Sequence, residues 1–231
     1  MRRALLHLCL LLALAACVET VPAAAPPAIR APLPDAAART RFETVVARME
    51  PVIERECLRL RAATNCDFRI VVDPRPDLPP NAYQTLDRSG RPILAFTLAL
   101  IGDVRNADEL AFAMGHEAAH HIAAHIPRRQ EDALTGALIL GVLAAASGAD
   151  PEGVREASDL GGRVGALRYA KAYELEADRL GTILAWEAGY DPLVGAAYFE
   201  RLPDPGNAFL GTHPPNAARI ATVRQTLATL R

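Results

Sequence analysis

The chain has 231 residues, of which 51% are hydrophobic and 23% are charged, a composition typical of a folded globular protein and unlike that of a disordered one. Its 25 basic and 27 acidic residues leave a formal net charge of −2, so no basic excess indicates a nucleic-acid partner. This length suffices for one domain with a hydrophobic core of its own.

Residues 1–16 have the pattern of a signal peptide. Arg2 and Arg3 precede an apolar run of about ten residues, which fits a secretion signal and is too short to span a bilayer. The run ends in the letters LAAC, which resemble the bacterial lipobox. The resemblance implies cleavage before Cys17 and attachment of lipid to that residue. The alternative is a plain secretory signal in which Cys17 is incidental.

The segment after the signal is expected to be a tether. Residues 17–35 are rich in Pro and Ala and have little apolar surface to bury. Val18 stands where an Asp would resemble an inner-membrane retention signal. Several acyl chains on Cys17 would anchor the chain stably. We therefore expect an outer-membrane lipoprotein that faces the periplasm, with its folded domain at residues 36–231.

The first half of that domain mixes helix and strand patterns. Apolar residues recur every three or four positions over about 36–61, which predicts a helix that Pro51 kinks or divides. Short β-rich runs follow at 68–72 and 81–86, and residues 92–100 read as a strand or a strand-to-helix passage.

A helix is then predicted to begin after Asn106, with Glu109 completing a capping box, and to end near Ile126, before Pro127. The apolar run 133–146 is short for a membrane span, so we expect a buried core helix. A segment that dips into the membrane surface or covers the active cleft is the alternative.

The rest of the domain is predicted to be loop and helix. Residues 148–165 are Gly-rich and read as a loop, followed by helices at about 164–188 and 216–230. Cys57 and Cys66 are nine residues apart, which permits a disulfide in an oxidising compartment without requiring one. Two buried free thiols are the alternative.

Residues 116–120 read HEAAH, the HExxH pattern of zinc peptidases, on a predicted helix. Residues four apart share one face of an α-helix, so His116 and His120 can point at one metal ion. Glu117 lies beside the first ligand, where its carboxylate can accept a proton from water at the metal. The pattern predicts one Zn²⁺ per chain, with Glu117 as the catalytic base.

A catalytic zinc site usually has a third protein ligand. Glu174 and Asp178 are four apart on a predicted helix, so one can bind the metal while the other accepts the second N–H of a ligating His. Glu176 faces away and is expected at the surface. His125 lies about 180° from His116 on a straight helix. His121 and His125 lack an adjacent Glu, so we expect packing or supporting roles for them.

These motifs together resemble the gluzincin family of zinc metallopeptidases that contains the CAAX prenyl proteases and the HtpX-type proteases. The resemblance rests on HExxH, on YELEADRLG at 173–181, on THP at 212–214 ahead of Arg219, and on NAY at 81–83. It implies that Glu174 binds the metal and that Asp178 orients a His. The several membrane spans of the prenyl proteases are absent from this sequence, which favours the soluble periplasmic or lipoprotein branch.

The same resemblance directs attention to the C-terminal third of the chain. His213 matches the family's HP motif, and we expect it over the zinc, either as a donor to the oxyanion or as a ligand in a resting state. A plain loop His is the alternative. Arg219 is expected on a helix surface, with contact to substrate as the alternative.

We therefore expect an α+β fold, mostly helical, with a small sheet beside the HExxH helix, and a zinc endopeptidase that cleaves unfolded or misassembled envelope polypeptides. Three alternatives stay open: an envelope chaperone or binding module that retains the metal without proteolysis, a zinc hydrolase acting on other bonds, and a protease that waits for a partner.

Overall fold

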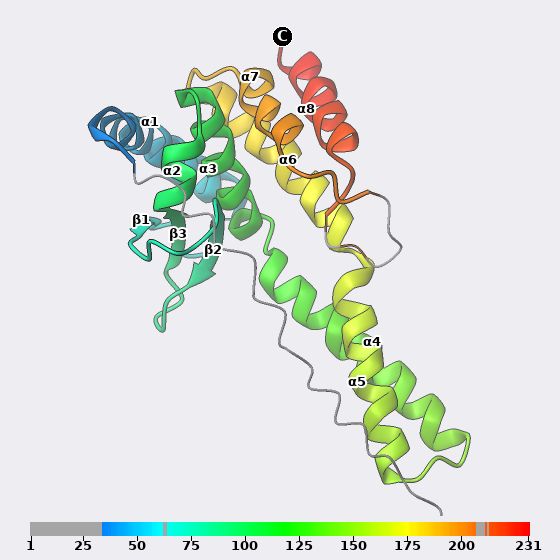
Figure 1. Cartoon of the computed structure of the whole chain (residues 1–231). Coiled ribbons are helices and arrows are strands. Elements are labelled where there is room, and N and C mark those ends of the chain that lie inside the picture. The colour runs from blue at the N-terminus through cyan, green and yellow to red at the C-terminus, as the bar shows by residue number, and fades with distance from the viewer. Residues whose placement is uncertain (1–33, 62–63, 207–210, 212) are drawn as a thin grey trace, which may run out of the picture.

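A computed structural model describes residues 34–61, 64–206, 211 and 213–231 (Figure 1). The predicted signal peptide, Cys17 and all but the last two residues of the predicted tether lie outside these residues. The elements are α1 (Ala36–Arg61), β1 (Arg69–Asp73), β2 (Ala82–Leu86), β3 (Pro92–Thr97), α2 (Leu98–Asp103), α3 (Ala107–Ile122), α4 (His125–Ala146), α5 (Pro151–Arg168), α6 (Ala170–Glu187), α7 (Pro192–Ala196), the 3-10 helix η1 (Ala197–Arg201) and α8 (Asn216–Leu230).

The fold is α+β and mostly helical with one small sheet, as expected from the sequence. The sheet has three strands in the order β1-β3-β2, with β1 parallel and β2 antiparallel to the central β3. The strand at 81–86 and the strand-to-helix passage at 92–100 are therefore confirmed. Pro51 lies within α1 and does not divide it.

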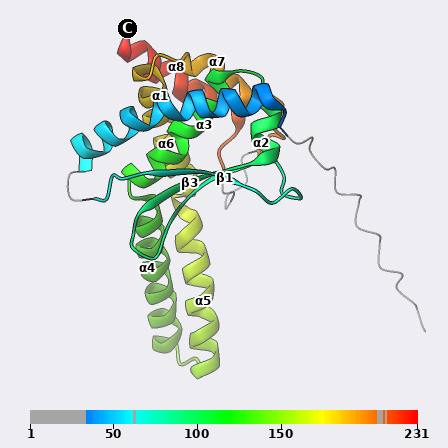
Figure 2. The same cartoon turned by 90° about the vertical axis from the view of Figure 1, so that its left-hand side faces the viewer.

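Helix α3 is the centre of the body (Figures 1 and 2). Its side chains Leu110 and Met114 belong to the main core, which α1, the sheet, α2 and α6 complete. Phe112 belongs to a second cluster with α7, η1 and α8. Because α3 is packed on several sides, its position is strongly determined. The main core is built from residues between Ala38 and Tyr190, so the described part of the chain contains a complete core.

Helix α3 begins at the predicted cap but ends earlier than predicted. Asn106 accepts a hydrogen bond from the backbone of Glu109 (2.8 Å). The helix stops at Ile122, Ala124 takes a left-handed conformation (φ 57°), and α4 begins at once. Pro127 lies in the first turn of α4, where a backbone N–H has no partner within the helix, so proline is tolerated there.

Helices α4 and α5 form a hairpin that projects away from the rest of the molecule (Figures 1 and 2). The prediction of a loop over 148–165 was wrong, because α5 occupies most of it. Two glycines of α5 allow close packing against α4 and do not form a turn. A Cβ at Gly161 would lie 2.1 Å from the carbonyl oxygen of Gly136, and one at Gly165 would lie 2.1 Å from that of Asp132.

The run 133–146 was predicted as a buried core helix, and this was also wrong. It is helical, but only one of its faces packs on α5, and the large side chains on the other face are exposed. Within the described residues, no helix has both the length and the apolar character needed to cross a membrane.

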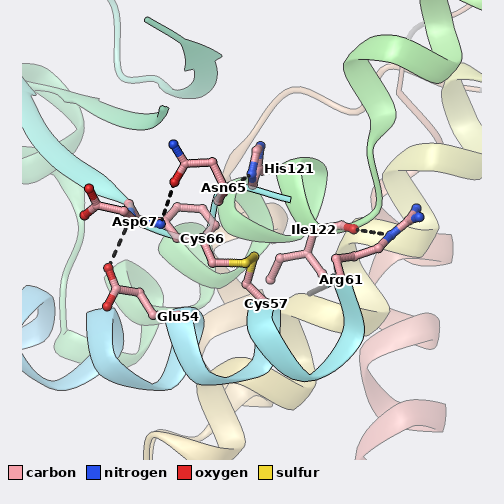
Figure 3. The surroundings of a disulfide bond; sticks show 9 residues. Glu54, Cys57, Arg61, Asn65, Cys66, Asp67, His121 and Ile122 are labelled. Atoms are coloured by element: carbon pink, nitrogen blue, oxygen red, sulfur yellow. Dashed lines mark hydrogen bonds between the residues drawn. A yellow bond between two sulfur atoms is a disulfide. The ribbon is translucent and has the colours of Figure 1, made fainter. Parts of the chain in front are cut away.

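A disulfide joins Cys57 of α1 to Cys66 (Figure 3). By the loop-entropy argument, a bridge across so short a loop stabilises the fold by about 2–3 kcal/mol. Bonds to the end of α3 lie on both sides of it: Arg61 donates to the carbonyl of Ile122 (3.0 Å), and His121 donates to the carbonyl of Asn65 (2.8 Å). The disulfide therefore holds together the two residues, Arg61 and Asn65, that bond to the C-terminal end of the HExxH helix. His121 has the packing role predicted for it.

Candidate metal centre

Two helices bring the predicted metal-binding side chains together. His116 and His120 lie on α3, and Glu174 lies on α6. The helices cross at Gly115 and Gly181, where a Cβ on Gly181 would lie 2.8 Å from the backbone nitrogen of His116. Only glycine allows this approach, which explains why a glycine follows the acidic motif on α6.

The three side chains form a cluster that can hold a metal ion. The Nε2 atoms of His116 and His120 are 3.1 Å apart, and each lies 3.5 Å from an oxygen of Glu174. Tetrahedral bonds of about 2.0–2.1 Å place neighbouring ligand atoms about 3.3–3.4 Å apart. The donor set and its spacing therefore fit a small tetrahedral cation. Among the described residues, this is the one group of at least three His, Cys, Asp or Glu side chains so arranged.

Behind His116 lies a buried ion pair. The Nδ1 atom of His116 is 2.9 Å from Asp178, which fixes the tautomer that leaves Nε2 free to bind metal. Arg219 of α8 holds the Asp178 carboxylate with two hydrogen bonds, of 2.6 and 2.8 Å. Its guanidinium lies 3.7 Å from the ring centre of Phe199. The expectation that Arg219 is a surface residue was wrong, because α8 packs against α6 and buries this side chain.

Behind His120 lies a second set of supporting contacts, in which His125 has the supporting role expected for it, although its partners were not predicted. The Nδ1 atoms of His120 and His125 are 2.8 Å apart, and Nε2 of His125 is 3.2 Å from Glu176. Arg128 donates to the same carboxylate (2.8 Å). The expectation that Glu176 is a surface residue was wrong, since it is half-buried between these partners. The left-handed residue Ala124 breaks the helix and directs His125 toward His120. The prediction assumed a straight helix, on which His125 would point away from the metal ligands.

His125 should therefore tune the affinity for metal. Changing it to Phe keeps a ring to stack on Tyr173 but removes the acceptor for His120 Nδ1–H. We expect metal affinity to fall about 10- to 100-fold, as for other partners of metal-bound histidines. Competition with a chromophoric chelator measures this. His125→Asn supplies a polar side chain in the same place and should lose less; an unchanged affinity in His125→Phe would contradict the role.

The electrostatics of the cluster favour a cation. Burial by itself lowers the pKa of His116, but hydrogen bonds to Asp178 and Glu174 outweigh it and raise that pKa to about 10. Burial and the neighbouring His116 lower the pKa of His120 to about 3. Burial raises the pKa of Glu174, yet hydrogen bonds from His116 and His213 bring it well below its ordinary value. The carboxylates thus draw positive charge to the point where the ligand atoms converge.

Glu117 lies beside this point at the floor of a cleft of about 470 Å³. Burial raises the pKa of its carboxyl group, which makes the carboxylate a stronger base. A hydrogen bond from the backbone of Gln84 offsets part of this shift. Gln84 belongs to β2, which pairs with β3 on one side, so the other side of this strand faces the cleft.

His213 lies at the mouth of the same cleft. Its Nδ1 atom is 3.1 Å from an oxygen of Glu174, and its side chain is 55% exposed. The structure thus places it against a predicted ligand of the metal.

The motifs, the crossing helices and the cleft are those of a metallopeptidase, and comparison with known proteins agrees. The model of peptidase family M48 matches residues 44–227. The chain belongs to peptidase family M48. The family match confirms the metallopeptidase resemblance carried by the motifs, and it covers α3, α6 and most of α8, which hold the metal cluster and its supporting residues.

Two relatives illustrate the similarity. The chain is 32% identical over 137 residues to the mitochondrial metalloendopeptidase OMA1 of Arabidopsis thaliana, which is 58% of this chain and 27% of that protein. It is 30% identical over 132 residues to the beta-barrel assembly-enhancing protease of Escherichia coli, which is 52% of this chain and 27% of that protein. The chain therefore spans about a quarter of the length of these M48 relatives.

Proposed function

We propose that this chain is a zinc-dependent endopeptidase in which His116, His120 and Glu174 bind the metal. The observation that carries the proposal is the convergence of their three ligand atoms, spaced 3.1–3.5 Å apart. Nitrogen and oxygen donors in this number, with an open side toward a cleft, suit catalytic zinc. Zinc in such a site supplies Lewis acidity, which polarises a carbonyl and acidifies water.

The side chains around the metal position have separate tasks. Glu117 accepts the proton of the attacking water and passes it to the leaving amine. Asp178 keeps His116 in the tautomer that presents Nε2. His213, at the cleft mouth, donates to the oxyanion that develops on the substrate carbonyl. The distance of 3.1 Å between its Nδ1 atom and a Glu174 oxygen supports this role.

The substrate in this proposal is an extended polypeptide. The free side of β2 faces the cleft, and residues 81–84 line it next to Glu117. An extended peptide can add to such a strand edge through backbone hydrogen bonds, which read conformation and not sequence. This mode suits unfolded or misassembled proteins, since their backbones are accessible.

The metal requirement is testable directly. We expect the purified protein to hold one zinc per chain and to cleave a reduced, unfolded protein, with cleavage lost on chelation and restored by zinc. Glu174→Gln should lose metal content and cleavage together, because an amide oxygen is a weak ligand beside a carboxylate. Glu43→Gln, an exposed change on α1, is the control. Full zinc occupancy in Glu174→Gln would refute the ligand set.

We further propose that the enzyme is a lipoprotein on the periplasmic side of the outer membrane. The lipobox-like sequence ending at Cys17 supports this, and the Cys57–Cys66 disulfide suits an oxidising compartment. In cells, Cys17→Ser should move the protein from the outer-membrane fraction, and incorporation of labelled fatty acid should cease. Labelled fatty acid in Cys17→Ser would show that Cys17 is not the anchor.

A further inference from the structure

The outer side of α4 carries an unusual concentration of exposed aliphatic side chains, here called the α4 aliphatic face. Each of them is at least 58% exposed, although all are large and apolar: Leu134, Leu138, Ile139, Val142 and Leu143. They fall on adjacent ridges of one helix, so they form a continuous strip. Soluble proteins rarely leave so large an apolar strip in contact with water unless it binds something.

The hairpin is built to present this face. Residues 133–149 contain no charged residue, and the side of α4 opposite the strip is used by glycines that let α5 approach. A Cβ at Gly141 would lie 2.3 Å from the hydroxyl of Ser158, nearly as close as the 2.1 Å contacts at Gly136 and Gly161. Packing of this kind depends on shape and holds equally in water and in lipid.

We propose that the α4 aliphatic face docks on the surface of a lipid bilayer. Its composition favours lipid over a protein partner, because interface centres are enriched in aromatic residues, Met and Arg, and the strip has only Leu, Ile and Val as large side chains. Contact with hydrocarbon chains requires neither a specific shape nor hydrogen bonds, and aliphatic side chains form no hydrogen bonds.

The charges around the hairpin define how it would lie. Asp150 and Glu152 stand at its tip, so insertion tip-first would bury two carboxylates at a high cost. Helix α4 therefore lies along the membrane with its strip in the headgroup region. The exposed charges of α5 are balanced, with three arginines against three acidic residues: Arg155, Arg163 and Arg168 against Glu152, Glu156 and Asp159. Binding should consequently need neither anionic lipid nor low salt.

The length of chain before the domain is compatible with this docking. If lipid is attached at Cys17, as proposed above, residues 17–35 can span at most about 65 Å, which lets the hairpin reach the same membrane. Helix α4 begins at His125, which contacts His120 at the metal cluster. A docked hairpin would therefore bring the cleft to the membrane surface. The docking proposal rests on the exposed strip and does not require the lipid predicted at Cys17.

Flotation with vesicles tests the proposal on residues 18–231, which retain every described element and the complete core but lack the predicted lipid site. The face variant combines Leu134→Gln, Leu138→Gln and Val142→Gln. The control variant combines Leu58→Gln, Leu86→Gln and Val194→Gln, which change exposed apolar residues on α1, β2 and α7. Vesicles of phosphatidylcholine, with and without phosphatidylglycerol, are used at low and high salt.

We expect the parent protein to float in all these conditions, the face variant to partition at least about tenfold less, and the control to stay within about twofold. Equal flotation of the face variant and the parent, or no flotation of the parent, would overturn the proposal. The proposal would also be overturned if the parent were a dimer that does not float and the face variant were a monomer. The face would then be covered by a second copy of the chain and not by lipid. Cleavage activity of these variants is measured separately, so a failed peptidase assay leaves the docking result intact.

A second measurement avoids dependence on a triple change. An environment-sensitive fluorophore is attached at Leu138→Cys on the strip, or at Glu156→Cys on the exposed side of α5, with Cys57 and Cys66 protected by their disulfide. Vesicles should shift the emission of the first label to the blue and leave the second unchanged. The same shift at both positions, or at neither, would contradict docking through the α4 aliphatic face.

Discussion

Glu117→Gln should reduce cleavage of an unfolded protein by about a thousandfold or more while leaving the metal bound. The amide keeps the size of the side chain but cannot accept the proton of the attacking water, and general-base catalysis contributes about 10²- to 10⁴-fold. Glu117 lies beside the cluster without belonging to it. Its replacement should therefore leave the three ligand atoms in place.

The measurement pairs kcat/KM on a reduced, unfolded protein with metal content by mass spectrometry. Glu43→Gln, an exposed position on α1 that does not line the cleft, controls for the loss of a carboxylate. Cleavage by Glu117→Gln at the parent rate, with zinc in place, would end the peptidase proposal and favour a chaperone or binding module that keeps its metal.

Asp178→Asn should be the most destabilising of the changes at the site. Asp178 is fully buried and holds both His116 and Arg219. Burial raises the pKa of this carboxyl group, but hydrogen bonds from Arg219 and His116 keep it below its ordinary value, so the native state contains the carboxylate. Its loss leaves the guanidinium of Arg219 buried without its partner, at a cost of about 3–5 kcal/mol.

Urea unfolding of the metal-free proteins measures this, with metal affinity measured beside it. The affinity should fall about 10- to 100-fold, because His116 loses the acceptor that fixes its tautomer. Arg219→Gln and the double variant complete a cycle. If the two residues act as a pair, the double variant is less destabilised than the sum of the single changes by about 2–3 kcal/mol. Additive effects would show that the pair contributes nothing of its own.

The elements near the catalytic motif followed from local sequence. The cap at Asn106, the strand at 81–86 and the last helix follow from local patterns of residue types, which can be recognised in the sequence. The hairpin was misjudged on both of its helices. Glycines that normally interrupt a helix were read as loop residues in α5, whereas they allow close packing on α4. The apolar run 133–146 was predicted to be buried, because the local sequence does not indicate whether another element packs on it.

The family and the chemical types of the central residues could be predicted from the sequence alone, because two histidines four apart, a neighbouring glutamate and a distant acidic pair form a combination that arises rarely by chance. The sequence also indicated Asp178 as a supporting residue, but the partners that complete the support around the ligands follow from the assembled fold. The contacts of Arg219 with Asp178 and of His125 with His120 depend on how α8 packs and on one left-handed residue between α3 and α4. The supporting contacts join residues whose separation along the chain follows no helical or strand period, so they are properties of the assembled fold.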